Sequence, residues 1–88
     1  MAKLSARGRT ELARIVRKET IPDGNTTKER RTTLALMSDR TILEKFDVTY
    51  PDGMKNSFSW KVRTRKVKAD VTPEQFIETF AKHGFVRA

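Results

Sequence analysis

Residues Ser57–Lys68 constrain the fold of this 88-residue chain more than any other stretch. In its first half, Phe58, Trp60 and Val62 alternate with serine and cationic residues. Successive side chains of a β-strand point to opposite faces, so a period of two predicts a half-buried strand. The apolar residues are expected at the centre of the core, and the other face carries cations and no acid. The sequence therefore predicts a basic, solvent-exposed sheet surface.

The positive charge of the chain is concentrated in two stretches. The formal net charge is +8, to which residues 1–18 contribute +5 and residues 55–68 contribute +6, while the remainder sums to −3. Blocks of like charge repel one another unless a polyanion neutralises them. Nucleic acid, either DNA or RNA, is the expected partner. An acidic protein surface and an anionic membrane are the alternatives.

Length and cysteine content limit the class of protein. Eighty-eight residues are typical of a single domain, here residues 1–88. The absence of cysteine excludes disulfides and cysteine-ligated zinc. No apolar run resembles a signal peptide or approaches the roughly 20 residues that span a bilayer. We expect a cytoplasmic monomer or dimer, with a membrane as the least favoured partner.

Residues 3–19 are predicted to form an amphipathic helix. At 100° per residue its apolar side chains fall on one arc and its cations on the opposite arc. The apolar stripe contains Leu12, Ile15 and Val16. Gly8 weakens the first turn by about 1 kcal/mol relative to alanine. The helix is therefore expected to begin either near residue 3 or only at Thr10, and the second alternative leaves residues 1–9 as a flexible basic arm.

Three strands are predicted after a polar loop at residues 20–31. The loop is expected because Pro22-Asp23-Gly24-Asn25 is dense in turn formers and the residues after it lack apolar side chains. The strands are Arg31–Met37, Thr41–Tyr50 and the basic stretch described above. Short turns, among them Pro51-Asp52-Gly53, join them into an antiparallel meander.

The C-terminal helix has the clearest boundary signals. Thr72 is the expected N-cap, Pro73 takes the first helical position, and Gln75 completes a capping box. Gly84 is expected to end the helix, and Phe85 to fold back on its last turn. The predicted fold class is α+β, a two-layer helix–three-stranded antiparallel meander–helix (αβββα). Both helices would cover one sheet face and leave the other face open.

This αβββα order resembles the double-stranded-RNA-binding domain, whose second helix offers a Lys-Lys-x-Ala-Lys cluster to phosphates. The corresponding helix here opens with the acidic sequence Thr72-Pro-Glu-Gln75. The resemblance therefore extends to the topology and not to that RNA contact. Three-stranded sheets that read DNA, as in some integrase arm-binding domains, are similar through the basic third strand. Fold similarity alone does not determine function.

Neither catalysis nor metal binding is predicted. The chain has one histidine, no cysteine and scattered acids, whereas a metal site needs clustered ligands. His83 is explained by its position at a helix C-terminus, where a cation complements the helix dipole. Neither Pro-Asp pair is followed by the Asp/Glu-x-Lys of some nucleases. We expect a protein that is not an enzyme and that uses no cofactor or metal.

The predicted binding site is the solvent face of the basic strand, supported by the helix at residues 3–19. Lys61, Arg63 and Arg65 recur every two residues, about 6.6–6.8 Å apart, which is close to the phosphate repeat along one nucleic-acid strand. Further contributors are expected to be Lys45, Lys68, Arg7, Arg14 and Arg17. If the helix packs on the sheet, its cations face away from it, and the two basic patches lie on opposite sides.

A different function fits the same composition. A small inhibitor or adaptor of phage or mobile-element type, similar in style to anti-CRISPR proteins, would dock its basic face on an acidic or nucleic-acid-processing protein. Nucleic-acid binding predicts an affinity that falls steeply with salt. The protein-binding alternative predicts capture of a protein partner instead.

Overall fold

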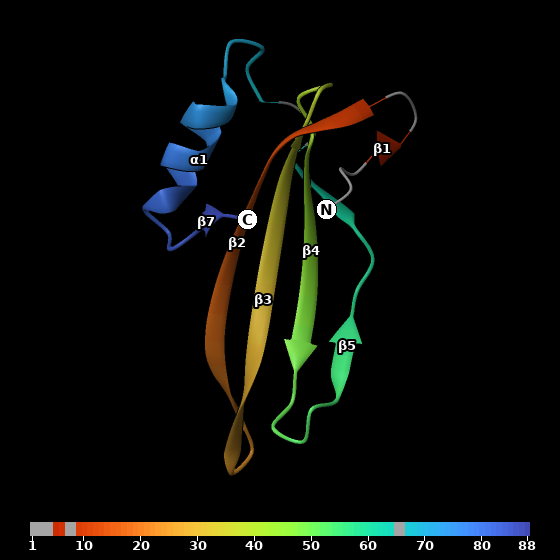
Figure 1. Cartoon of the computed structure of the whole chain (residues 1–88), viewed down its shortest axis with the longest axis vertical. Helices are drawn as coiled ribbons and strands as arrows, with labels where there is room; N and C mark the ends of the chain where they lie inside the picture. The colour runs from red at the N-terminus through yellow and green to blue at the C-terminus, as the bar shows by residue number, and fades with distance from the viewer. Residues whose placement is uncertain (1–4, 7–8, 65–66) are drawn as a thin grey trace.

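The structure is a computed structural model of the chain, and it describes residues 5–6, 9–64 and 67–88 (Figure 1). Within these ranges the chain is mostly antiparallel sheet with one short C-terminal helix. The elements, in chain order, are β1 (Ser5–Ala6), β2 (Arg9–Asp23), β3 (Thr26–Met37), β4 (Ile42–Thr49), β5 (Lys55–Ser57), β6 (Lys61–Thr64), α1 (Pro73–Ala81) and β7 (Val86–Arg87).

The sheet is organised around three long strands. Its order is β1-β2-β3-β4-β5, with β6 also paired to β4 and β7 paired to β2. β5 and β6 occupy successive stretches of one edge, because β5 pairs with Asp47–Thr49 and β6 with Ile42–Glu44. At the other edge, α1 and β7 lie beside β2 (Figure 1). No helix among the described residues is long and apolar enough to cross a membrane.

The predicted αβββα fold is wrong, because residues 9–23 form the 15-residue strand β2 and not a helix. Ile15 and Val16 are both buried, but adjacent residues of a strand point to opposite faces. Leu12 lies where the register shifts between Glu11 and Ala13, and it is 38% exposed. The three residues of the predicted apolar stripe therefore do not share a face: Ile15 and Val16 lie on opposite faces of β2, and Leu12 lies at a bulge. Their helical spacing is coincidental.

The predicted loop at residues 20–31 is also wrong, although its turn is correctly placed. β2 and β3 remain paired up to Asp23 and Thr26, so that only Gly24 and Asn25 connect them. Gly24 has a φ of 62°, which suits the first central position of a two-residue hairpin turn. Pro22 lies within β2, where proline is tolerated because this stretch pairs with β3 alone.

The three predicted strands differ in outcome, since two are confirmed and the third is wrong. The strands predicted at Arg31–Met37 and Thr41–Tyr50 are confirmed in β3 and β4, and β3 extends further toward the hairpin turn. The basic stretch is not one strand, since it forms the end of β5 and the whole of β6 with residues 58–60 between them, where Phe58 still donates a backbone hydrogen bond to Phe46.

The main hydrophobic core lies between the sheet and α1. Its buried members are Ile15, Leu34, Leu36, Ile42, Phe76 and Phe85. We call this side of the sheet the helix face. A smaller cluster on the opposite side, the open face, contains Ala35, Met37 and Leu43, with Trp60 packed against it. The centre of β3 is therefore buried on both faces.

The prediction that Phe58, Trp60 and Val62 form the core centre is wrong. Phe58 is 48% exposed and Val62 is 49% exposed, and only Trp60 packs against a buried cluster. The interruption between β5 and β6 removes the regular alternation on which the prediction depended. The side of this stretch that was expected to be buried therefore lies largely in solvent.

The C-terminal helix is confirmed at its start and at its end. The Thr72 hydroxyl accepts a hydrogen bond from the Gln75 backbone N–H at 3.1 Å, and the Gln75 side chain accepts one from the Thr72 backbone N–H at 2.9 Å. Pro73 is the first helical residue. Gly84 has a φ of 87°, and Phe85 folds back, edge-on to Phe80 at 5.7 Å between ring centroids. This return of the chain closes the main core.

Candidate functional site

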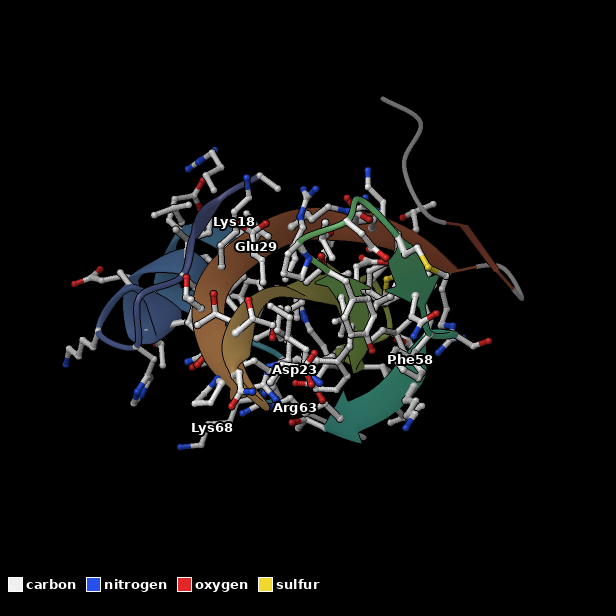
Figure 2. All side chains as sticks on the ribbon, turned by 90° about the horizontal axis from the view of Figure 1, so that it is seen from below. Lys18, Asp23, Glu29, Phe58, Arg63 and Lys68 are labelled. Atoms are coloured by element: carbon white, nitrogen blue, oxygen red, sulfur yellow. The ribbon has the colours of Figure 1, made fainter. Side chains whose placement is uncertain are left out.

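A polar hollow of about 410 Å³ lies on the open face of the sheet, between Trp60 and the hairpin turn. The side chains of register partners lie on the same face of a sheet. The pairings β2–β3, β3–β4 and β4–β5 therefore place two rows of residues side by side across the open face. We call it the open-face hollow; it is lined by Lys18, Glu29, Arg31, Asp47, Thr49, Lys55 and Ser57. Figure 2 shows Lys18 and Glu29 on this side of the sheet and Arg63 on the other.

Three cations in the hollow are exposed and have no ion-pair partner among the described residues. They are Lys18 on β2, Arg31 on β3 and Lys55 on β5. Lys18 and Arg31 are direct cross-strand neighbours. Like charges placed opposite each other destabilise a sheet; Asp47, the register partner of Arg31 on β4, offsets part of this cost, but its carboxylate is shared with Lys45. The hollow is therefore a place where an external anion is favoured.

The carboxylates of the hollow do not cancel its charge. Asp47 lies 3.9 Å from the ammonium of Lys45, which stands next to the hollow on β4. Glu29 is the second carboxylate, and it is exposed. Counting Lys45, four cations face two carboxylates. Thr49 and Ser57 add hydroxyl groups, which donate hydrogen bonds to phosphate oxygens in many nucleic-acid complexes.

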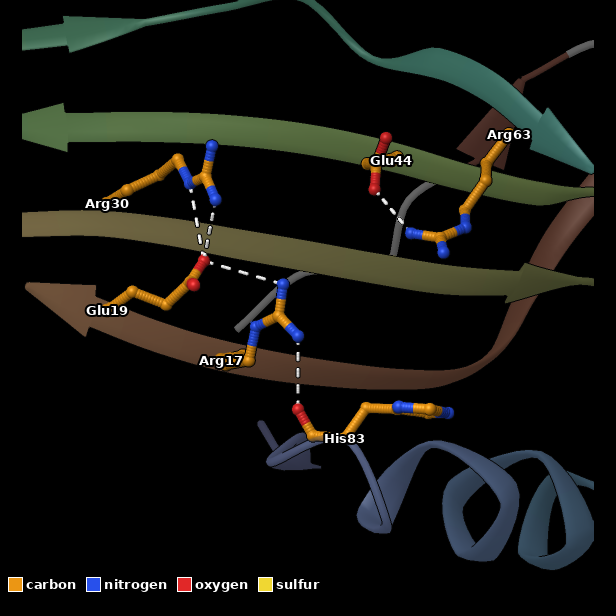
Figure 3. A network of polar contacts seen from close by, with 6 residues as sticks. All are labelled: Arg17, Glu19, Arg30, Glu44, Arg63 and His83. Carbon is orange, nitrogen blue, oxygen red and sulfur yellow. Dashed lines mark hydrogen bonds and ion pairs between the residues drawn. The ribbon is translucent and has the colours of Figure 1, made fainter. Parts of the chain in front are cut away.

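Arg17, predicted to bind nucleic acid, lies on the helix face and holds the fold together (Figure 3). Its guanidinium donates a hydrogen bond to the backbone carbonyl of His83 at 3.1 Å and lies 3.4 Å from the carboxylate of Glu19. The same guanidinium lies 4.7 Å from the centre of the Phe85 ring. Arg17 thus connects β2 to the segment that follows α1.

Lys61 and Arg63, two of the three cations of the predicted row, share a face, but it is the helix face and not the open face. Arg63 points to the helix face, where it donates a 2.7 Å hydrogen bond to Glu44 (Figure 3). Its guanidinium also lies 5.6 Å from the Phe80 ring centroid. Lys61 is exposed and is the register partner of Glu44. Lys68 is exposed in the connection between β6 and α1.

The remaining predicted residues divide between the open face and the part of the chain that is not described. Arg14 is on the open face, where it pairs with Glu11 at 2.7 Å and lies 5.5 Å from the centre of the Trp60 ring system. Lys45 stands beside the hollow. Arg7 and Arg65 lie outside the described residues.

Sequence reasoning missed Lys18, Arg31 and Lys55 as a group. Lys18 was placed on a helix, Arg31 where a loop meets a strand, and Lys55 was counted in the basic stretch 55–68 without a position in the sheet. The signal that could have found them is the register of the hairpin. A two-residue turn at Gly24–Asn25 makes Lys18 and Arg31 opposite each other and puts both on one face.

Two carboxylates of the structure have pKa values below the usual range. The pKa of Glu19 is lowered chiefly by the hydrogen bond from Arg30, with a further contribution from the charge of Arg17, against partial burial that raises it. The pKa of Asp39 is lowered chiefly by its hydrogen bonds with Thr41, and the charge of Arg9 adds to the effect. Both groups belong to the framework and lie outside the open-face hollow.

Substituting Glu19→Gln should lower stability at neutral pH and have a smaller effect in acid. The lowered folded-state pKa means that the Glu19 contribution is present above the unfolded pKa, about 4.3, and is lost as the pH falls below it. Urea unfolding at pH 7 and pH 3 measures this difference. Glu29→Gln is the control, and an effect of Glu19→Gln that is equal at both pH values would contradict the ion-pair network.

No protein-family model, curated protein or solved structure matches the chain. Among the described residues there is also no group of three or more histidine, aspartate or glutamate side chains that could hold a metal ion. The function is therefore inferred from the geometry and charge of the open-face hollow.

Proposed function

We propose that this protein binds the phosphate backbone of nucleic acid through the open-face hollow. The observation that carries the proposal is the gathering of Lys18, Arg31 and Lys55 from three different strands, all exposed and none in an ion pair with another described residue, although Arg31 lies opposite Asp47. Lysine and arginine supply most of the affinity of proteins for nucleic acid by neutralising phosphates. Phosphates seated here would also remove the repulsion between Lys18 and Arg31.

The spread of these cations favours a chain of phosphates over a single phosphate group. Lys18 and Lys55 are separated by three strand spacings of about 4.8 Å, or about 14 Å across the sheet. A single phosphate would require both side chains to converge across that backbone distance, whereas a polynucleotide presents phosphates at regular intervals that separate cations can contact. The concentration of +6 in residues 55–68 and the net charge of +8 favour the same class of ligand at longer range.

The composition of the hollow favours binding without strong sequence preference. Its lining offers cations and hydroxyls, which contact phosphate and sugar and carry no base information by themselves. Trp60, the aromatic residue next to the smaller core cluster, is covered by Arg14 and is therefore not free to stack on a base. We expect affinities for unrelated sequences of the same length to be similar.

Affinity for nucleic acid should fall steeply with salt. Three or four phosphate contacts give a slope of about −2.7 to −3.6 in log affinity against log salt for duplex DNA, hence a loss of about 40- to 150-fold between 50 and 200 mM. Fluorescence anisotropy with labelled single- and double-stranded DNA and RNA of one length measures it. Absence of binding to all four probes at 50 mM salt, or affinity that does not change with salt, would contradict the proposal.

A further inference from the structure

The outer edge of β5 and β6 has no strand partner within the described part of the chain. Each of these strands pairs with β4 on one side only. Residues 55–63 are all exposed except Trp60, so this edge is open to solvent. An open edge presents unpaired backbone N–H and C=O groups, which can pair with an additional strand.

Apolar side chains accompany this open edge. Phe58 follows β5 and is 48% exposed, and Val62 is in β6 and is 49% exposed. β5 and β6 are short and carry lysine, and both features protect edges from unwanted pairing, but exposed phenylalanine and valine do not serve that purpose. Every second side chain of an added strand lies on the face of Val62, and an apolar side chain there would contact Val62 and shield it from solvent.

The charge of the edge determines which strand it accepts. Within the described residues, β5 and β6 carry Lys55, Lys61 and Arg63 and no acid; Arg63 is paired with Glu44, whereas Lys61 is exposed without an ion-pair partner there. A second copy of this chain paired edge to edge would bring cations against cations. An extended segment that carries carboxylates would instead place opposite charges side by side, which stabilises cross-strand pairs.

We infer that this edge binds an acidic, extended segment of a partner protein by strand addition to β6. Backbone hydrogen bonds to β6 give the affinity, and alternate side chains give the specificity, one set against Val62 and the acidic set toward Lys61. Nucleic acid has no backbone that pairs with a strand edge. The inference does not depend on the proposed function, because β6 contributes no residue to the open-face hollow.

The experiment uses an end-blocked eight-residue peptide of alternating valine and glutamate. Trp60, the one tryptophan of the chain, immediately precedes β6, and its fluorescence reports binding there. Two matched peptides accompany it, one with lysine in place of glutamate and one with alternate backbone amides N-methylated. We expect saturable binding of the acidic peptide, and affinities lower by at least about tenfold for both matched peptides.

Variants separate this edge from the open-face hollow. Val62→Asp introduces a charge of the same sign as the peptide's glutamates and should weaken binding of the acidic peptide by about tenfold. Lys61→Gln should weaken the same binding by a smaller factor. Replacing Lys18, Arg31 and Lys55 together with alanine should leave peptide binding unchanged. No binding of the acidic peptide at 50 mM salt, or equal binding of its N-methylated form, would overturn the inference. It would also be overturned if Val62→Asp weakened nucleic-acid binding and not peptide binding.

Discussion

Replacing Phe85 with alanine is expected to lower the free energy of unfolding by about 3–5 kcal/mol. Phe85 is 3% exposed, contacts Phe80 edge-on and lies under the Arg17 guanidinium. The substitution removes the ring that joins the segment after α1 to the core. Domains of this size are stable by about 5–15 kcal/mol, so a large part of the stability would be lost. Urea unfolding followed by circular dichroism measures the change.

Phe58→Ala is the matched control for this prediction. It removes the same side chain from a site that is 48% exposed, so we expect a loss under about 1 kcal/mol. Both variants change the chain by one phenylalanine, and they differ in burial alone. If Phe58→Ala destabilised the protein as much as Phe85→Ala, the assignment of the core to the helix face and not to the basic stretch would be contradicted.

The sequence predicted α1 well because its boundary signals are local. The capping box of Thr72 and Gln75, proline at the first position and Gly84 after the end each depend on a few neighbouring residues. The turns around Gly24 and Gly53 were predictable for the same reason, since both glycines have positive φ. Features that a short segment determines by itself were therefore correct.

Strand β2 was not predictable from its periodicity. Leu12, Ile15 and Val16 have the spacing of a helical stripe, but Ile15 and Val16 are buried on opposite faces of one strand. A strand with both faces covered at its centre loses the alternation that identifies strands. The cover comes from α1 over Ile15 on one face, while Val16 is buried on the other face between its register partners Thr33 of β3 and Val86 of β7; α1 and β7 are distant in sequence. Tertiary packing determined the secondary structure here.

The candidate site in the structure differs from the predicted one because the sequence of a single strand does not give its register with its neighbours. The basic stretch predicted a cationic row on one face, but Arg63 turns to Glu44 on the helix face, and the strand is interrupted. The cations of the open-face hollow come from β2, β3 and β5, and only the pairing of these strands brings them together. The expectation of a basic open sheet face remains a proposal, now with different residues.

Two variants of equal charge separate site-specific binding from general attraction to a basic protein. One replaces Lys18, Arg31 and Lys55 with alanine, and the other replaces Lys68, Lys82 and Arg87. Each set removes two lysines and one arginine, all exposed, and the second set lies in or beside α1 and β7. Because both variants lose three charges, long-range electrostatic attraction falls by the same amount in each.

The affinity of these two variants for a labelled oligonucleotide at 50 mM salt tests the central claim most directly. At about 1 kcal/mol or more for each charged contact, the hollow variant should bind about a hundredfold more weakly, and the matched variant only a few-fold. Glu29→Gln, which removes a carboxylate from the same hollow, should bind about fivefold more tightly. Equal losses in the two triple variants, with no gain for Glu29→Gln, would contradict binding at the open-face hollow.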